Sequence, residues 1–87
     1  MPQKISKIRK RDGRIVDFNP QKIANAIHKA FNAVKMKNGE LAEKLSREVV
    51  RIVEERFADK IPTVEDVQDI VERVLIKNGY AEVAKAY

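Results

Sequence analysis

The fold is decided by one stretch near the start of the chain, Lys10-Arg11-Asp12-Gly13-Arg14-Ile15-Val16-Asp17-Phe18-Asn19-Pro20-Gln21-Lys22-Ile23. Asp12-Gly13 predicts a two-residue hairpin turn of type I′, because that turn needs positive φ at both central residues. The β-prone segment 14–18 would return from this turn beside segment 5–10. Asn19-Pro20 then predicts a helix start, since asparagine is a good N-cap and proline suits the first helical position.

The cationic side chains of this stretch have no block of carboxylates to neutralise them. Lys22 would lie in the first helical turn, where the positive end of the helix dipole disfavours a cation. Lys10 and Arg11 would lie close by on the hairpin, together with the exposed N–H groups of the helix start, which bind anions readily. Arginine can hold two phosphate oxygens at once and lysine acts as a point charge. We therefore expect a bound polyanion here, with a merely solvated basic surface as the alternative.

Composition bounds the class of protein. A chain of 87 residues is one domain. It has no cysteine, which excludes disulfides, thiolate metal sites and a thiol nucleophile. It has no apolar run long enough to span a membrane and no signal-peptide pattern, so we expect a cytoplasmic protein with no membrane partner.

The excess positive charge is confined to the beginning of the chain. The net charge is +5, and residues after position 14 carry equal numbers of basic and acidic side chains. Residues 1–14 carry a single acid, Asp12, against six basic side chains, which are Lys4, Lys7, Arg9, Lys10, Arg11 and Arg14. A localised positive patch implies an anionic partner such as a nucleotide, a nucleic acid or a lipid headgroup.

The remainder of the chain has the apolar periodicity of helices. We expect helices over about 20–35 and 40–58, a third that begins after the N-cap Thr63 and ends at Asn78-Gly79, and a fourth over 80–87. Ile61 is expected to add a short extended segment beside the hairpin. The fold class is therefore α+β, with a small hairpin-based sheet packed on three long helices and a short fourth. Because the last helical pattern runs to the final residue, we expect a single domain, residues 1–87, excised from or N-terminal to a longer chain.

Several motifs together resemble one known family. The segment Lys10-Arg11-Asp12-Gly13-Arg14, followed by Phe18-Asn19-x-x-Lys22-Ile23, is similar to the opening signature of the ATP-cone. Segment 63–72 resembles the third helix of that family and segment 79–87 its closing segment. The ATP-cone is the regulatory nucleotide-binding domain at the N-terminus of many ribonucleotide reductases, and it also occurs in the repressor of reductase genes.

The resemblance implies a four-helix bundle capped by a three-stranded sheet, and one shared site for ATP and dATP, with Mg²⁺ arriving on the nucleotide. In the reductases, ATP keeps the enzyme active and dATP switches it off, usually through subunit assembly. The implied partners are a catalytic domain or subunit of a reductase and, through the helix faces, further copies of the chain. By position, the implied contacts are Lys10, Arg11 and Lys22 with phosphates, Ile8 with the base, Val16 and Asn19 with base and ribose, and Thr63 with the adenine edge.

Two residues depart from the pattern of the family. Asn19 stands where aspartate is commoner. Val16 stands where some members carry a polar or acidic base contact, so its backbone is expected to serve instead.

Other functions remain open on the sequence. The three glycines do not form a Walker A loop, and no catalytic constellation is visible, so we expect no enzymatic activity from the domain itself. A nucleic-acid-binding or repressor-type module is the main alternative, although the basic segment lacks interleaved aromatic residues on which bases could stack. A structural interaction domain with an incidental basic patch is the third possibility.

Overall fold

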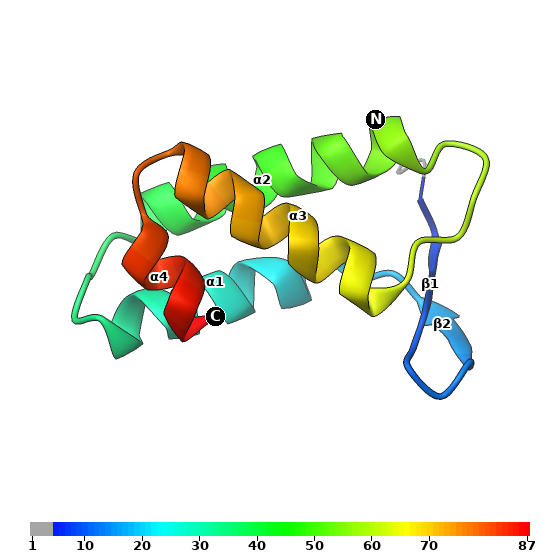
Figure 1. The fold of residues 1–87 in the computed structure, drawn as a ribbon, viewed down its shortest axis with the longest axis horizontal. Helices are drawn as coiled ribbons and strands as arrows, with labels where there is room; N and C mark the ends of the chain where they lie inside the picture. The colour runs from blue at the N-terminus through cyan, green and yellow to red at the C-terminus, as the bar shows by residue number, and fades with distance from the viewer. Residues whose placement is uncertain (1–4) are drawn as a thin grey trace.

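Two strands and four helices make up the part of the chain that the computed structural model describes, residues 5–87. The lead-in of residues 1–4, with Lys4, lies outside the described residues. In chain order the elements are β1 (Lys7–Arg9), β2 (Ile15–Asp17), α1 (Pro20–Ala33), α2 (Gly39–Arg56), α3 (Val64–Lys77) and α4 (Ala81–Ala86), as Figure 1 shows. The predicted α+β class and the four predicted helices are confirmed.

The hairpin forms where the sequence predicts it, but its turn is of a different type. β1 and β2 are antiparallel, with Ile8 opposite Val16. The N–H of Gly13 donates to the carbonyl of Lys10 at 2.9 Å, and the N–H of Lys10 donates to the carbonyl of Arg14 at 2.8 Å. Gly13 has a φ of 91°, whereas Asp12 is not among the described residues with positive φ. The type I′ prediction is therefore wrong, and the turn is a longer loop with glycine at its left-handed position.

The side chain of Asp12 explains this difference. Its Oδ1 accepts from the backbone N–H of Arg14 at 3.0 Å, and its Oδ2 accepts from Arg14 Nε at 2.7 Å. Aspartate often makes such a bond to the backbone two residues on, which substitutes for part of a turn. With its carboxylate held in this way, Asp12 supports the loop while Gly13 supplies the positive φ.

The predicted third strand is reduced to a single parallel bridge between Arg9 and Thr63. The N–H of Arg9 donates to the carbonyl of Pro62 at 2.9 Å. Pro62 has no N–H to give in return, and the N–H of Thr63 is donated to Asp66 Oδ2 at 2.9 Å. Because the connector offers few free donors, pairing stops after one bridge, and the sheet among the described residues has two strands.

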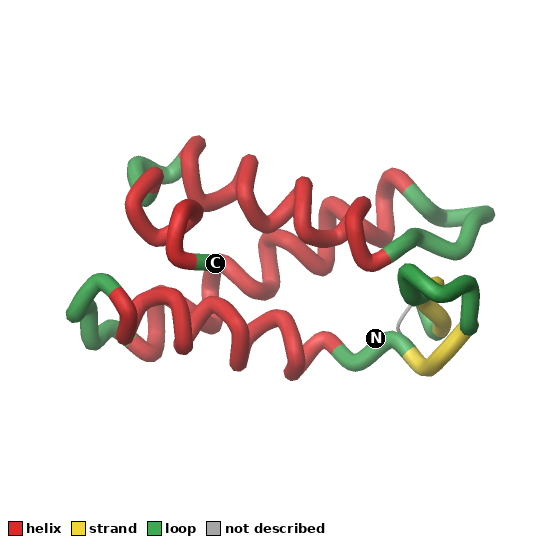
Figure 2. Tube along the Cα trace, turned by 60° about the horizontal axis from the view of Figure 1, so that its bottom comes forward, coloured by secondary structure: helices red, strands yellow, loops and turns green. Residues whose placement is uncertain are grey.

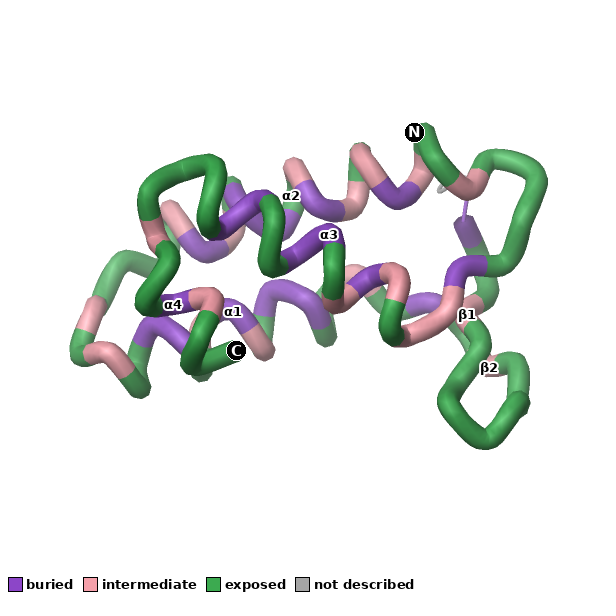
Figure 3. Tube along the Cα trace, in the orientation of Figure 1, coloured by how far each residue is buried: buried purple, intermediate pink, exposed green. Residues whose placement is uncertain are grey.

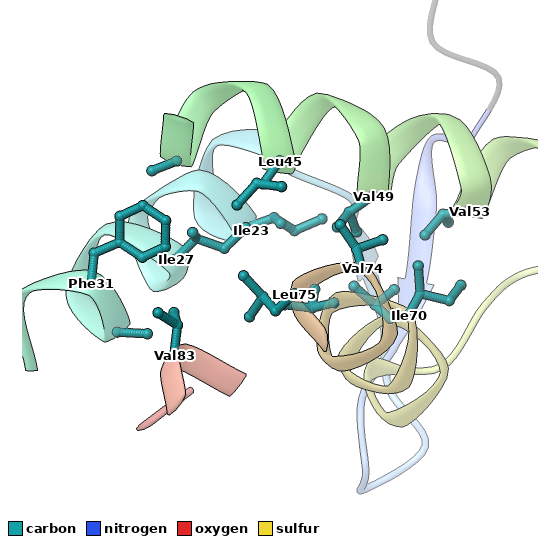
Figure 4. Close-up of a cluster of buried hydrophobic side chains, with 14 of the residues drawn as sticks. Ile23, Ile27, Phe31, Leu45, Val49, Val53, Ile70, Val74, Leu75 and Val83 are labelled. Atoms are coloured by element: carbon teal, nitrogen blue, oxygen red, sulfur yellow. The ribbon is translucent and has the colours of Figure 1, made fainter. Parts of the chain in front are cut away.

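The helices surround one apolar core. α2 packs against α1 and α3, and α4 packs against the same two helices from another side (Figure 2). α1, α2 and α3 each turn an apolar face inward, and α4 buries Val83. Figure 4 shows side chains from all four meeting between the ribbons, among them Ile27 of α1, Leu45 of α2, Leu75 of α3 and Val83 of α4. All four are at most 2% exposed.

The helix starts are fixed by local hydrogen bonds. Thr63 and Asp66 form a reciprocal capping box, in which Thr63 Oγ1 accepts from the N–H of Asp66 at 3.0 Å. Asn19 Oδ1 accepts from the N–H of Gln21 at 3.0 Å at the start of α1. These caps fix the residues at which α1 and α3 begin. Across residues 5–87, every helix is too short or too polar to cross a membrane.

The hairpin projects from one end of the helices. Figure 3 shows mainly exposed residues along it, while buried residues line the inner helix faces. Ile5 and Phe18, at its two ends, are buried and join the core. The hairpin is thus anchored to the core at its base, while its strands remain beside the starts of α1 and α3.

Candidate functional site

A cavity of about 180 Å³ lies between the hairpin, the start of α1 and the first turns of α3. Pockets that enclose an entire small ligand are usually about 300–1,000 Å³, so this one can enclose a ring, with the rest of a larger ligand along its rim. The residues that line it are Ile8, Lys10, Val16, Asp17, Phe18, Asn19, Lys22, Ile23, Val64, Val67, Gln68 and Tyr87. Of the seven site residues predicted from the sequence, five lie here: Ile8, Lys10, Val16, Asn19 and Lys22.

One wall of the cavity is the apolar face of the hairpin. Ile8 and Val16 are direct cross-strand partners, and both are half-buried, whereas the strand residues on either side of them are exposed. Side chains alternate between the two faces of a sheet. The pair therefore presents a flat apolar surface to the cavity, of the kind that packs against an aromatic ring.

Two lysines lie at the rim of this apolar surface. Lys10 comes from the hairpin and Lys22 from the first turn of α1. The first turn of α1 has no acidic residue, and within residues 5–87 neither ammonium forms an ion pair. Asp17, the carboxylate that lines the cavity, forms an ion pair with Lys7, its partner on the neighbouring strand. The rim thus keeps two cations available for an anionic ligand.

The backbone N–H groups at the start of α1 are not free to bind an anion as the sequence predicts. These groups were expected to be exposed to an anion, but the N–H of Gln21 donates to Asn19 Oδ1 and the N–H of Lys22 donates to the carbonyl of Asn19 at 3.0 Å. Pro20 has no N–H. Since the asparagine cap already satisfies these donors, an anion here would depend on the lysine side chains rather than on the helix backbone.

The remaining two predicted residues lie beside the cavity without lining it. Arg11 is turned toward α3, where its Nη2 donates to Gln68 Oε1 at 3.2 Å and its Nε lies 3.8 Å from Glu65 Oε1. Thr63 is half-buried, and its hydroxyl serves the capping box of α3.

Most of the residues that the sequence reasoning missed come from α3 and the end of the chain. Val64, Val67 and Gln68 form the α3 wall, and Tyr87 closes one side. Partial burial raises the pKa of the Tyr87 hydroxyl, although the residue as a whole remains 36% exposed. The helical periodicity places Val67 on the core face, but nothing in it says that the start of this face would meet the hairpin.

Comparison with known proteins identifies the family of this chain. The family described as the ATP cone domain matches residues 6–87. The chain is 39% identical to part of the ribonucleoside-diphosphate reductase subunit alpha of Chlamydia pneumoniae, covering 90% of this chain and 8% of that protein. It is 40% identical to part of the vitamin B12-dependent ribonucleoside-diphosphate reductase of Thermoplasma acidophilum, covering 95% of this chain and 11% of that protein.

A third relative, the anaerobic ribonucleoside-triphosphate reductase of Haemophilus influenzae, is 37% identical over 90% of this chain. The chain spans about a tenth of the length of these relatives. Because the family match covers nearly every described residue, including the whole cavity, the chain belongs to the ATP-cone family of regulatory, adenine-nucleotide-binding domains.

Proposed function

We propose that this domain binds ATP and dATP in the cavity between the hairpin, α1 and α3. The observation that carries the proposal is the position of the Ile8–Val16 surface directly beside Lys10 and Lys22. An adenine ring would pack on the apolar pair, and the phosphates would extend to the two ammonium groups at the rim. The rest of the nucleotide would lie along the rim, in keeping with a cavity that encloses only one ring.

The other predicted contacts fit around this pose. Asn19 lines the cavity and would lie beside the ribose. Thr63 would offer its carbonyl or hydroxyl to the adenine edge from the start of α3. Mg²⁺ would arrive on the phosphates, since this ion is commonly held by substrate phosphates and water rather than by a cage of protein ligands.

The role of the bound nucleotide would be regulatory. We propose that the domain is the activity switch of a cytoplasmic ribonucleotide reductase, with ATP and dATP favouring different arrangements of the domain against its catalytic partner. A ligand shifts such an equilibrium only by the difference between its affinities for the two states. The ribose 2′-hydroxyl is the only chemical difference between the two effectors. The contacts around the ribose would therefore set which state is favoured, and contact between copies of the domain through their helix faces would transmit it.

Nucleic-acid binding by the hairpin is less favoured. Lys7 is paired with Asp17 and Arg14 with Asp12, so two of the basic side chains on the hairpin are already neutralised. A groove for a polyanion would need a longer run of free cations, because each phosphate contact adds to affinity through counterion release.

A calorimetric titration of the domain tests the proposal. Saturable binding of Mg-ATP and Mg-dATP, with GTP much weaker, is the expected result. A short DNA duplex titrated at two salt concentrations is the control for binding by charge alone. Tighter binding of the duplex than of either adenine nucleotide, with a steep salt dependence, would favour the nucleic-acid function instead.

A further inference from the structure

Arg11 contacts two side chains of α3. Its guanidinium joins the hairpin to α3 through Gln68 and Glu65, at 3.2 and 3.8 Å. Lys10 and Lys22, the other two predicted phosphate contacts, form no ion pair within residues 5–87. The three cations of the proposed site are therefore not equivalent: two are available, and one is held by α3.

The contact of Arg11 is adjacent to the cavity. Gln68 lines the cavity, and it is the same side chain whose Oε1 accepts from Arg11. Glu65 follows Val64, another lining residue, in the first turn of α3. A guanidinium that turned from this pair toward a phosphate at Lys10 would release both the Glu65 carboxylate and the amide of the cavity wall.

We propose that Glu65 competes with the nucleotide phosphates for Arg11, so that nucleotide binding exchanges a hairpin–α3 contact for a hairpin–ligand contact. This inference rests on the proposed function. Glu65 therefore lowers the affinity of the domain for the nucleotide. Because Arg11 must leave Glu65 to reach the phosphates, nucleotide binding also loosens the contact between the hairpin and α3. Release of that attachment supplies a structural change that a neighbouring domain can detect.

The expected gain in nucleotide affinity on removing the Glu65 carboxylate depends on how exposed its ion pair with Arg11 is to water. The side chains of Arg11 and Glu65 are 70% and 54% exposed. Exposed ion pairs are weak because water screens them, so removing the competing carboxylate should raise affinity by about two- to fivefold. A change of this size is measurable by calorimetry.

The test is a double-mutant cycle with Mg-ATP. The affinity of the unaltered domain is compared with those of Glu65→Gln, Arg11→Ala and the combined variant. Asp69→Asn is the matched control, because it removes an exposed carboxylate one turn further along α3 that has no ion pair among the described residues. A cycle isolates the interaction between two residues from the separate effect of each.

The expected result is that Glu65→Gln binds Mg-ATP about two- to fivefold more tightly and that this gain disappears when Arg11 is alanine. An equal gain in the Arg11→Ala background, or the same gain from Asp69→Asn, would mean that the carboxylate acts only through the general field and would overturn the proposal. No gain from Glu65→Gln would also overturn it, while leaving nucleotide binding intact. If the unaltered domain binds no adenine nucleotide, the proposed function fails together with this inference.

Discussion

Ile8 and Val16 lie directly opposite each other across the hairpin, and both line the cavity next to α1 and α3. Their position is a consequence of strand alternation, because each is the half-buried middle residue of a three-residue strand whose outer residues are exposed. The register of the hairpin thus decides which side chains meet a ligand. A shift of one residue would replace this pair by exposed, mainly charged side chains.

The first prediction concerns this apolar pair. Val16→Ala should weaken Mg-ATP binding by about three- to tenfold, since up to two buried methyl groups would lose contact with the base. Ile15→Ala is the matched control, because Ile15 is the adjacent strand residue, faces away from the cavity and is 47% exposed. Equal losses of affinity in both variants, measured by calorimetry, would show that the ligand does not contact this face of the hairpin.

The second prediction concerns the lysines at the rim. The double variant Lys10→Ala/Lys22→Ala should lose at least about a hundredfold in affinity for Mg-ATP, because a charge-assisted hydrogen bond to phosphate contributes about 1.5–3 kcal/mol for each cation. The control double variant, Lys37→Ala/Lys77→Ala, removes two exposed lysines at the other end of the helices from the hairpin (Figure 1). If the control lost as much affinity, the effect would come from net charge alone.

The third prediction concerns the start of α3. Thr63→Ala should lower the free energy of unfolding by about 0.5–2 kcal/mol, because the N–H of Asp66 loses its acceptor. Thr63→Ser keeps the oxygen and should retain most of the stability. Urea unfolding of the two variants checks this, and similar losses in both would mean that the hydroxyl is not the source of the stabilisation.

The fourth prediction concerns acid. The ammonium of Lys7 lowers the pKa of Asp17, and the backbone N–H and guanidinium of Arg14 lower the pKa of Asp12, in each case below the ordinary value of 3.8. A group with a depressed folded-state pKa adds stability that is present above its unfolded pKa and is lost as pH falls through the folded value. Acid should therefore weaken the hairpin.

Urea midpoints measured as a function of pH check this directly. The difference between the unaltered domain and Asp12→Asn/Asp17→Asn should close as pH falls from about 5 to about 2. Asp59→Asn/Asp69→Asn is the control, since neither of these residues forms an ion pair within the described part of the chain. A difference that stayed constant across this range would contradict the assignment of the two pairs.

The sequence predicts well what is determined by near neighbours. The buried residues of α3 lie on one face of the helix, as the apolar periodicity of its sequence predicts; they are Val67, Ile70, Val71, Val74 and Leu75. The predicted N-caps of α1 and α3 are also confirmed, because each cap is a hydrogen bond between residues only two or three positions apart in the sequence. α1 and α2 each end two residues earlier than expected, and helix ends are the part of a helix that sequence patterns define least well.

The sequence predicts poorly those features in which two partners compete for the same hydrogen-bonding group. The turn type was wrong because the Asp12 carboxylate bonds to Arg14, and the third strand was wrong in extent because Thr63 gives its N–H to Asp66. The α3 wall of the cavity was missed because Gln68 lies sixty residues beyond Ile8 in the sequence. Only the folded packing shows that the start of α3 meets the hairpin.

The central claim is that the adenine nucleotide binds between the hairpin, α1 and α3, and it is tested most directly by nuclear magnetic resonance of the isotope-labelled domain during titration with Mg-ATP. The account predicts saturable shifts in the backbone signals of Ile8, Val16, Lys22 and Gln68, all of which lie at the cavity. Signals from Ser46 and Val50, which lie in a separate groove between α1 and α2, should stay in place. Shifts concentrated at that groove, or absent from the hairpin, would contradict the account.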